Sequence, residues 1–551
     1  MNRPAIVAVL SLTFLVYLLG ARIPVLDIDS AQYASMSREM LERGDFLHVY
    51  DEGRDYLDKP PFLFWVSALS MKVFGPYNFA FRLPSVLFSL LALYAVYRLA
   101  RLYYNNTIAI LSALVLATSQ ALFLITHDVR TDTILMSWVI VALWQLAEWF
   151  QRRKPLNLIL GFAAIAGGML TKGPIALIVP ALALGVHFIL RRELFKQLFR
   201  WQNIAGLFII AVLLIPMTTG LYQQFDMHPE KTVNGKQGVS GVRFFYWTQS
   251  FGRITGESEW NNHAGFFFLF QNMLWSFLPW IVFFTCSLFA TVKKLWQKKF
   301  KITGNEEGIT IGGFILAYVA LGLSKYQLPH YIFVVFPLAA VITAVFLYNL
   351  LWENKYAALK KILVPFHFVL LALMWFVPAT LCFWAFPQIP FFYKLLSVLL
   401  PAGYFILLFV KKIRQRLLLL CFYTSTGINF ILTGGFYPEL LTYQGGSEAG
   451  KWVHEHKIKE GKFKAFRYPH FRSLHFYARS IVPQVTETNN IHTEDFVLTD
   501  SAGLAQLKQS GKDYTIKTEG GNFHVAMLNA TFINPGTREK ALKKYYIAEI
   551  K

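Results

Sequence analysis

Long apolar blocks alternate with short polar stretches along most of the chain. Each block is about 17–25 residues long, which is the length that a helix needs to cross the roughly 30 Å hydrocarbon core of a bilayer. This pattern predicts a polytopic α-helical membrane protein with about thirteen transmembrane helices. The blocks lie at 5–21, 79–99, 107–126, 132–150, 156–171, 174–190, 203–222, 264–290, 309–324, 331–350, 362–386, 395–410 and 416–436. We interpret the first block as a retained anchor and not as a signal peptide, because no small-residue cleavage site follows it.

Two parts of the chain do not follow this pattern. Amphipathic helical patterns at 31–42 and 61–73 lie inside a long polar loop, and we expect them to lie along the membrane surface. After a helical pattern at 447–456, short strand-like runs at 496–498 and 524–528 predict a small soluble α/β domain. The expected organisation is a transmembrane domain at 1–440, with outer-face juxtamembrane helices within 22–78, followed by the soluble α/β domain at 441–551.

The charges support a membrane protein and predict its orientation. Only 15% of the residues are charged, against roughly 25% in ordinary soluble domains. The net charge of +21 comes largely from basic clusters that follow alternate apolar blocks. Such clusters are typical of cytoplasmic loops, so the basic balance does not indicate a nucleic-acid partner. We therefore expect the N-terminus in the cytoplasm and the C-terminal domain on the outer side.

On the expected outer side, charged and hydrogen-bonding residues gather near the ends of the spans. A charge near the centre of a bilayer costs on the order of 3 kcal/mol, so charged groups at span ends tend to face a polar cavity. Taken one at a time, each is also compatible with an ordinary interfacial residue. The set consists of Asp27, Asp29, Asp58, Lys59, Asp132, Lys172, Arg253, His263, Lys325, Tyr326 and His330.

Several segments that contain these residues resemble a known family. They are Asp27-Ile-Asp-Ser-Ala-Gln-Tyr33, Tyr56-Leu-Asp-Lys-Pro-Pro61, Arg130-Thr-Asp132, Thr171-Lys-Gly-Pro174 and Lys325-Tyr-Gln-Leu-Pro-His-Tyr331. The set is similar to the outer loops of the aminoarabinose transferase and protein O-mannosyltransferase group. One departure is that Asp29 is followed by Ser30, and that Gln32 precedes Tyr33, where the family usually has glutamate and arginine.

The resemblance implies a GT-C fold and a glycosyltransferase of the bacterial inner membrane whose C-terminal domain is periplasmic. Such enzymes move a sugar from a polyprenyl (undecaprenyl) phosphate donor to a hydroxyl or phosphate of an acceptor. The acceptor is an envelope glycolipid similar to lipid A, or a protein. The expected partners are thus the lipid-linked donor, the acceptor and the bilayer, and we expect a monomer.

The chemistry of this transfer assigns roles to the candidate residues. An acceptor hydroxyl needs a carboxylate as base or orienter, a role that we give to Asp29, with Asp132 in the same cavity. The leaving phosphate needs cations, and Lys59 and Arg253 are the best candidates. The others are candidates for binding substrate or a metal: Asp27, Asp58, Lys172, His263, Lys325, Tyr326 and His330.

A divalent metal is a candidate cofactor, because Asp58, His263 and His330 could converge, and imidazole and carboxylate groups suit zinc. Ordinary hydrogen bonding is the alternative role for the two histidines.

Two other function classes remain open from the sequence. A transporter of lipid-linked sugars would also have many spans and buried charges, but transporters place their ionisable groups near the midplane of the membrane. An O-antigen-type ligase would share both topology and substrate class. An assay with a radiolabelled polyprenyl-phosphate sugar separates the three.

Overall fold

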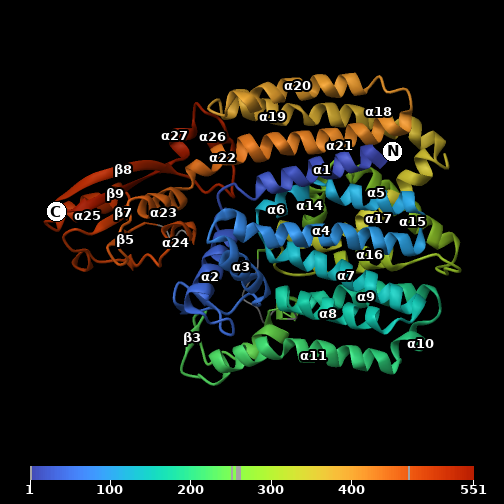
Figure 1. Ribbon diagram of the computed structural model, residues 1–551, viewed down its shortest axis with the longest axis horizontal. Helices are drawn as coiled ribbons and strands as arrows, with labels where there is room; N and C mark the ends of the chain where they lie inside the picture. The colour runs from blue at the N-terminus through green and yellow to red at the C-terminus, as the bar shows by residue number, and fades with distance from the viewer. Residues whose placement is uncertain (1–2, 250–251, 256–261, 469–471) are drawn as a thin grey trace.

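The computed structural model describes residues 3–249, 252–255, 262–468 and 472–551. Most helices run side by side in one bundle, and a sheet-containing region is attached to one end of it (Figure 1). The N-terminus lies at the opposite end of the bundle from the C-terminal sheet. The two ends of the bundle therefore differ, because only one of them carries the sheet. The predicted site residues belong to segments near that end.

Seven helices are long and apolar enough to cross a membrane among the described residues, or eight if a bent pair counts as one span. They are α4 (Asn78–Tyr103), α7 (Thr131–Arg152), α8 (Pro155–Lys172), Trp201–Asp226 with α11 (Trp201–Leu221), Pro329–Leu351 with α17 (Phe336–Leu351), Ala357–Ala385 with α18 (Ala357–Met374), and Ile413–Tyr443 with α21 (Ile413–Ile431). The prediction of a multi-pass membrane protein is confirmed.

Shorter apolar helices account for the other predicted spans. They include α1 (Arg3–Gly20), α9 (Ile175–Leu190), α16 (Ile309–Gly322) and α20 (Phe391–Leu407). Every predicted block therefore overlaps at least one helix, while the total of about thirteen crossings stays a prediction.

Two predicted spans are broken helices. The block at 107–126 forms α5 (Asn106–Ala117) and α6 (Gln120–His127), which are bent by 54°. The block at 264–290 forms α14 (Phe268–Ser276) and α15 (Ile281–Gln297). Pro279 lies in the second break and cannot donate a backbone hydrogen bond.

The two breaks satisfy each other's polar groups. The Trp280 indole Nε1 donates to Thr118 Oγ1 at 3.0 Å, and the Gln120 backbone N–H donates to the Leu278 carbonyl oxygen at 3.1 Å. Such pairing is what permits an irregular backbone inside a membrane region, where water is not available as a partner.

A pair of short helices connects the bundle to the C-terminal region. They are α2 (Asp29–Arg43) and α3 (Phe62–Phe74), which overlap the amphipathic patterns predicted at 31–42 and 61–73. Tyr33 packs against Phe64 with their ring centroids 5.7 Å apart. Between α2 and α3, a small hairpin forms from β1 (Tyr50–Asp51) and β2 (Arg54–Asp55). Their position along a membrane surface stays a prediction.

The C-terminal region contains a five-stranded mixed sheet in the order β6-β5-β7-β9-β8. β5 pairs in parallel with β6 and β7, and β9 pairs antiparallel with β7 and β8. The strands are β5 (Phe463–Phe466), β6 (Gln484–Val485), β7 (Phe496–Thr499), β8 (Tyr514–Asn522) and β9 (Lys543–Ile550), and α23 (Gly445–Glu455), α24 (Arg472–Ala478) and α25 (Ser501–Gln509) are its helices. The predicted helix at 447–456 and strand at 496–498 correspond to α23 and β7. A domain boundary at residue 440 stays a prediction.

The strand predicted at 524–528 is wrong. β8 ends at Asn522, and the following segment leaves the sheet. Phe523 and Val525 are buried in the large apolar cluster of the helix bundle, and Phe523 stacks on Phe532 at 3.8 Å between ring centroids. Val525 is therefore buried by packing against the bundle and not by strand pairing, whereas Met527 and Leu528 are exposed.

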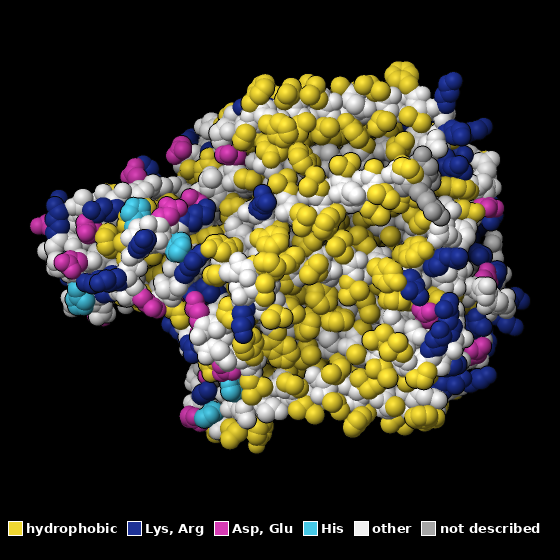
Figure 2. Space-filling view, viewed as in Figure 1, with side chains coloured by type: hydrophobic (Ala, Val, Ile, Leu, Met, Phe, Trp, Pro, Cys, Tyr) yellow, Lys and Arg dark blue, Asp and Glu magenta, His cyan; other side chains and the backbone are white. Residues whose placement is uncertain are grey.

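The surface agrees with a membrane protein. Figure 2 shows a broad hydrophobic face over the bundle, with Lys and Arg side chains gathered at the end opposite the C-terminal sheet. Charges of both signs cover the C-terminal region in the same view. The hydrophobic band fits a bilayer, because a soluble protein would cover such a surface with polar groups.

Candidate active site

A cavity of about 1240 Å³ lies between the helix bundle, the β1–β2 hairpin and the C-terminal region. Seven of the eleven side chains proposed from the sequence line it: Asp29, Asp58, Lys59, Asp132, Lys172, Tyr326 and His330. Segments separated by as many as 455 residues in the chain, from Asp29 to Gln484, thus contribute to one polar chamber. The wall on the C-terminal side includes Arg472 and residues 481–484.

Asp29 begins α2, and its carboxylate faces both the cavity and Arg130. Asp29 Oδ2 accepts a hydrogen bond from Arg130 Nη1, and Arg130 Nε donates to Asp128 Oδ2 at 2.8 Å. A carboxylate in the first turn is favoured by the partial positive charge of a helix N-terminus. The Asp29 side chain is 36% exposed, so it remains accessible to a substrate in the cavity. The sequence motif includes Arg130, but the sequence alone gave it no role.

Asp132 and Lys172 form a second ion pair deeper in the cavity. Asp132 is 1% exposed, and its Oδ1 lies 2.5 Å from Lys172 Nζ. Its Oδ2 lies 3.6 Å from His330 Nε2. Lys172 Nζ is also 4.0 Å from the centroid of the Tyr331 ring. Because Asp132 is in the first turn of α7 and Lys172 ends α8, both charges complement the dipoles of their own helices.

Lys59 is held at the base of the loop that leads into α3. Its Nζ lies 2.6 Å from Asp58 Oδ2, and Gln249 Nε2 donates to Asp58 Oδ1 at 2.9 Å. Pro60 and Pro61 follow, and α3 begins at Phe62. Two prolines fix the backbone before the helix, so the position of Lys59 is restricted. Gln249 is a contact that sequence reasoning missed.

An apolar groove of about 410 Å³ continues from this polar cavity. The two share Lys59, Asp132, Lys172 and Tyr331. Beyond these residues the groove has Gln249 and Ser324 as polar residues and is lined mostly by aliphatic side chains of α7, α9, α16 and the Pro329–Val335 segment: Leu135, Ile175, Ile178, Leu182, Ala320, Leu321 and Val334. A chamber with cations at the mouth of an apolar groove can accommodate an amphiphile that has an anionic head and a hydrocarbon tail.

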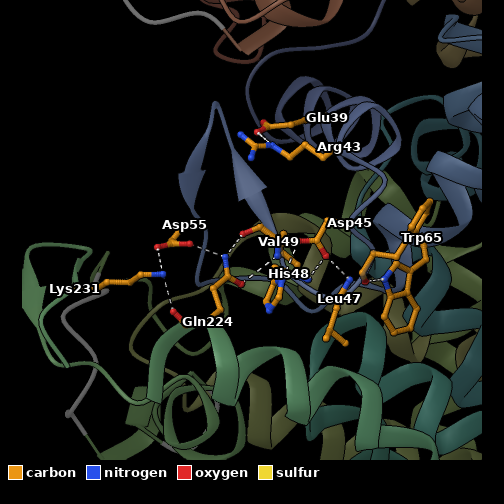
Figure 3. Close-up of polar contacts among 11 residues, drawn as sticks. Glu39, Arg43, Asp45, Leu47, His48, Val49, Asp55, Trp65, Gln224 and Lys231 are labelled. Carbon is orange, nitrogen blue, oxygen red and sulfur yellow. Dashed lines mark hydrogen bonds and ion pairs between the residues drawn. The ribbon is translucent and has the colours of Figure 1, made fainter. Parts of the chain in front are cut away.

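One wall of the cavity is fixed by polar contacts between the β1–β2 region and the end of the helix Trp201–Asp226 with the loop that follows it (Figure 3). The Gln224 side chain accepts a hydrogen bond from the Val49 N–H at 3.1 Å and donates to the Val49 carbonyl oxygen at 2.9 Å. It also donates to Asp55 Oδ1 at 2.8 Å, and Lys231 Nζ lies 2.9 Å from Asp55 Oδ2. Sequence reasoning missed Gln224, for which the available signal was an amide at the end of an apolar span.

Asp27 lies outside this cavity. It is 5% exposed, and its carboxylate accepts hydrogen bonds from the Ser473 N–H at 2.9 Å and from Ser473 Oγ at 2.6 Å. Burial raises the pKa of Asp27 to about 6 despite these hydrogen bonds. Asp27 therefore fastens the segment that precedes α2 to the C-terminal region.

Three other predicted residues are not part of the described cavity lining. His263 and Lys325 are exposed and do not line it. The side chain of Arg253 lies outside the described residues, although its backbone belongs to α13 (Gly252–Thr255).

The predicted convergence of Asp58, His263 and His330 on one metal ion is not found. Across 3–249, 252–255, 262–468 and 472–551, no group of three or more His, Cys, Asp or Glu side chains has a metal-binding arrangement. The reason is that Asp58 is paired with Lys59, His330 faces Asp132, and His263 is exposed and does not line the cavity.

Comparisons with known proteins agree with the resemblance seen in the motifs. Residues 58–218 match the family model described as dolichyl-phosphate-mannose-protein mannosyltransferase. An undecaprenyl phosphate-alpha-4-amino-4-deoxy-L-arabinose arabinosyl transferase from Edwardsiella ictaluri is 27% identical over 331 residues, which are 59% of this chain and 56% of that protein. The protein of the same description from Yersinia pestis (strain Pestoides F) is 28% identical over 334 residues, again 59% and 56%. The match thus spans little more than half the length of these relatives.

The fold is shared over the whole chain. The crystal structure of ArnT from Cupriavidus metallidurans bound to undecaprenyl phosphate aligns with a TM-score of 0.74 and 16% sequence identity, over 100% of this chain and 98% of that one. The crystal structure of the same protein in the apo state also gives a TM-score of 0.74. These matches confirm the GT-C fold and the resemblance to the aminoarabinose transferases.

Proposed function

We propose that this chain, which has the GT-C fold of the aminoarabinose transferase family, is an integral membrane glycosyltransferase of the bacterial inner membrane. It moves a sugar from an undecaprenyl-phosphate donor to an acceptor on an envelope glycolipid similar to lipid A. The observation that carries the proposal is the junction of the polar cavity with the apolar groove at Lys59, Asp132 and Lys172. The relatives named as arabinosyl transferases support the choice of reaction.

The donor fits this junction by its chemistry. Its phosphate meets Lys59, with Arg253 as the second cation, and its prenyl tail lies in the groove between α7, α9 and α16. In the resting structure Lys59 is neutralised by Asp58 and Lys172 by Asp132. A phosphate that enters competes with these carboxylates for the same cations. Interactions with Lys59 strengthen as negative charge grows on the departing phosphate, which is what lowers a barrier.

Asp29 acts on the acceptor in this proposal. The bond between the anomeric carbon and the phosphate oxygen breaks, and a bond from that carbon to the acceptor oxygen forms. When the acceptor is a hydroxyl, its proton passes to the Asp29 carboxylate, which is accessible from the cavity. Arg130 holds Asp29 in place, and Asp132 with Lys172 assists from the deeper side.

The orientation in the membrane belongs to the same proposal. The N-terminus is cytoplasmic, and the cavity and C-terminal region face the periplasm. Support comes from the Lys and Arg side chains gathered at the end opposite the C-terminal region (Figure 2). A monomeric state belongs to the same proposal.

A transporter is disfavoured by the position of the polar cavity. Its charges belong to segments at the end of the bundle that carries the C-terminal region, whereas transporters bind their cargo near the midplane. An O-antigen-type ligase would need the same classes of substrate. It is separated from the proposed enzyme by the size and identity of the transferred group.

The direct test uses the purified full-length chain with an undecaprenyl-phosphate pentose that carries a radiolabel, and with lipid A as the acceptor. Wild-type protein is expected to transfer label to lipid A. Lys59→Ala should abolish transfer, and Lys59→Arg should recover only part of it, because a guanidinium does not occupy the same point as an ammonium. The matched control is Lys355→Ala, an exposed lysine beyond α17. Failure of wild-type protein to transfer any sugar, or full activity of a folded Lys59→Ala enzyme, refutes the proposal.

A further inference from the structure

Arg54 lies in the β1–β2 hairpin, whose other residues are held in place by polar contacts. In the first strand, Asp51 accepts a hydrogen bond from Gln32 at 2.7 Å and pairs with Arg472. Glu52 Oε1 lies 3.2 Å from Arg472 Nη1 and 3.1 Å from His475 Nε2. These contacts join the hairpin to α2 on one side and to α24 on the other.

The turn and the second strand of the hairpin are held as well. The Gly53 N–H donates to Glu39 Oε1 at 2.9 Å. Asp55 is fixed by Gln224 and Lys231, as Figure 3 shows. Every neighbour of Arg54 from 51 to 55 therefore has an anchoring contact. Arg54 itself is exposed and lines the cavity.

Arg54 differs from the other cations of the cavity wall. Five lysines and arginines of the lining are each neutralised by a carboxylate that also lines the cavity. The pairs are Lys59 with Asp58, Arg130 with Asp29, Lys172 with Asp132, Lys231 with Asp55, and Arg472 with Asp51. Within the part of the chain that the structure describes, the Arg54 guanidinium has no hydrogen-bond or ion-pair partner.

We propose that Arg54 binds a phosphate group of the acceptor and so selects a phosphate-bearing glycolipid over a neutral acceptor. This inference rests on the proposed transferase function. A guanidinium binds phosphate through two parallel N–H bonds and remains charged at every accessible pH. A backbone fixed on both sides presents that group without a large ordering cost, which increases the affinity that one contact can give.

The position of Arg54 fits the acceptor and not the donor. It lines the polar cavity but not the apolar groove, whereas Lys59 and Lys172 line both. In the hairpin Arg54 pairs with Asp51 across the two strands. Asp51 accepts a hydrogen bond from Gln32, which is three residues after Asp29 on α2 and thus about one turn, or ~5 Å, along the same face. Arg54 is therefore joined through Asp51 and Gln32 to the helix that begins with Asp29, on a part of the cavity wall that the apolar groove does not share.

The test compares phosphorylated lipid A with the same glycolipid after removal of its phosphates, using the full-length protein. Arg54→Gln is expected to raise the KM for phosphorylated lipid A by about 10-fold, as for loss of one charge-assisted contact at an exposed site. The KM for the undecaprenyl-phosphate donor should not change. Arg54→Lys should recover part of the loss, because the point charge remains while the bidentate geometry does not. Arg467→Gln, an exposed arginine of the C-terminal region that does not line the cavity, is the control.

A binding measurement keeps this inference separate from the proposed function. Binding of phosphorylated lipid A to the detergent-solubilised chain, without donor, should weaken about 10-fold in Arg54→Gln. If wild-type protein binds the lipid in this way but transfers no sugar, the transferase proposal fails while the role of Arg54 stands. Equal binding by Arg54→Gln and wild type overturns the role of Arg54. An effect on the donor KM, or an equal effect with dephosphorylated lipid, also overturns it.

Discussion

Asp29→Asn is expected to lower turnover strongly while it changes the folding free energy only slightly, and the structure gives the size of both effects. The substitution keeps the size of the side chain but removes its charge and its ability to accept a proton. Arg130 would still be held by Asp128 at 2.8 Å. Because the Asp29 side chain is 36% exposed, the lost ion pair should cost less than about 1 kcal/mol of folding free energy.

The expected loss of turnover is much larger. Removal of a general base typically lowers the rate by a factor of roughly 10² or more, which corresponds to about 2.7 kcal/mol in the activation free energy. Turnover is measured from the transfer of radiolabelled sugar at saturating donor and acceptor. Thermal unfolding in detergent, followed by intrinsic fluorescence, reports stability on the same preparations.

Asp128→Asn is the matched control, because it removes the other carboxylate that holds Arg130. Its side chain is 14% exposed, so its loss should cost about 1–3 kcal/mol of stability while turnover falls less than in Asp29→Asn. A result in which Asp29→Asn keeps more than a tenth of wild-type turnover refutes the role of Asp29. A melting temperature that falls as much for Asp29→Asn as for Asp128→Asn refutes the energetic reasoning.

Two further predictions concern the C-terminal region and the orientation. Burial raises the pKa of Asp27 from 3.8 to about 6 in the folded protein, so its contribution to stability is present below about pH 4 and is lost as the pH rises through 6. This loss amounts to at most about 3 kcal/mol of folding free energy. The melting temperature of Asp27→Asn should therefore depend less on pH between 4 and 7 than that of wild type. An equal dependence of the two melting temperatures on pH contradicts the raised pKa of Asp27. In a chain whose three native cysteines are replaced, Asn489→Cys should react with a membrane-impermeant thiol reagent in cells with a permeabilised outer membrane, and Gln151→Cys should not. Labelling of both, or the reverse pattern, contradicts the orientation.

The sequence predicted the local features of the fold because they depend on local hydrophobic periodicity. The spans, the two helices of the first outer loop, and the helix and one strand of the C-terminal region follow from residues that are neighbours in the chain. The prediction was wrong at 524–528, where a short apolar run resembles a strand but Val525 packs against the bundle and no strand forms. It also treated two broken helices as single spans, since the partners that satisfy each break are about 160 residues apart.

In the candidate site, too, the sequence predicted local features, and the tertiary structure determined the contacts between distant segments. The motifs around two aspartates and a lysine before two prolines carried the resemblance to the aminoarabinose transferase group, and that resemblance suggested transfer from a lipid phosphate. Asp27 and Asp29 have the same side chain two positions apart, yet only the tertiary structure decides between them. Asp29 starts a helix and faces the cavity, whereas Asp27 is buried against Ser473, which lies 446 residues further along the chain.

The sequence by itself determined which groups lie near the ends of the helices. Only the tertiary structure determined how they pair. Each ion pair of the cavity depends on the packing of separate helices, such as Asp132 of α7 with Lys172 of α8, or Arg130 with Asp29. A hydrophobic pattern specifies which face of a helix is buried, but the attraction between two charges depends on the distance between them. That distance is set by the packing of the whole bundle.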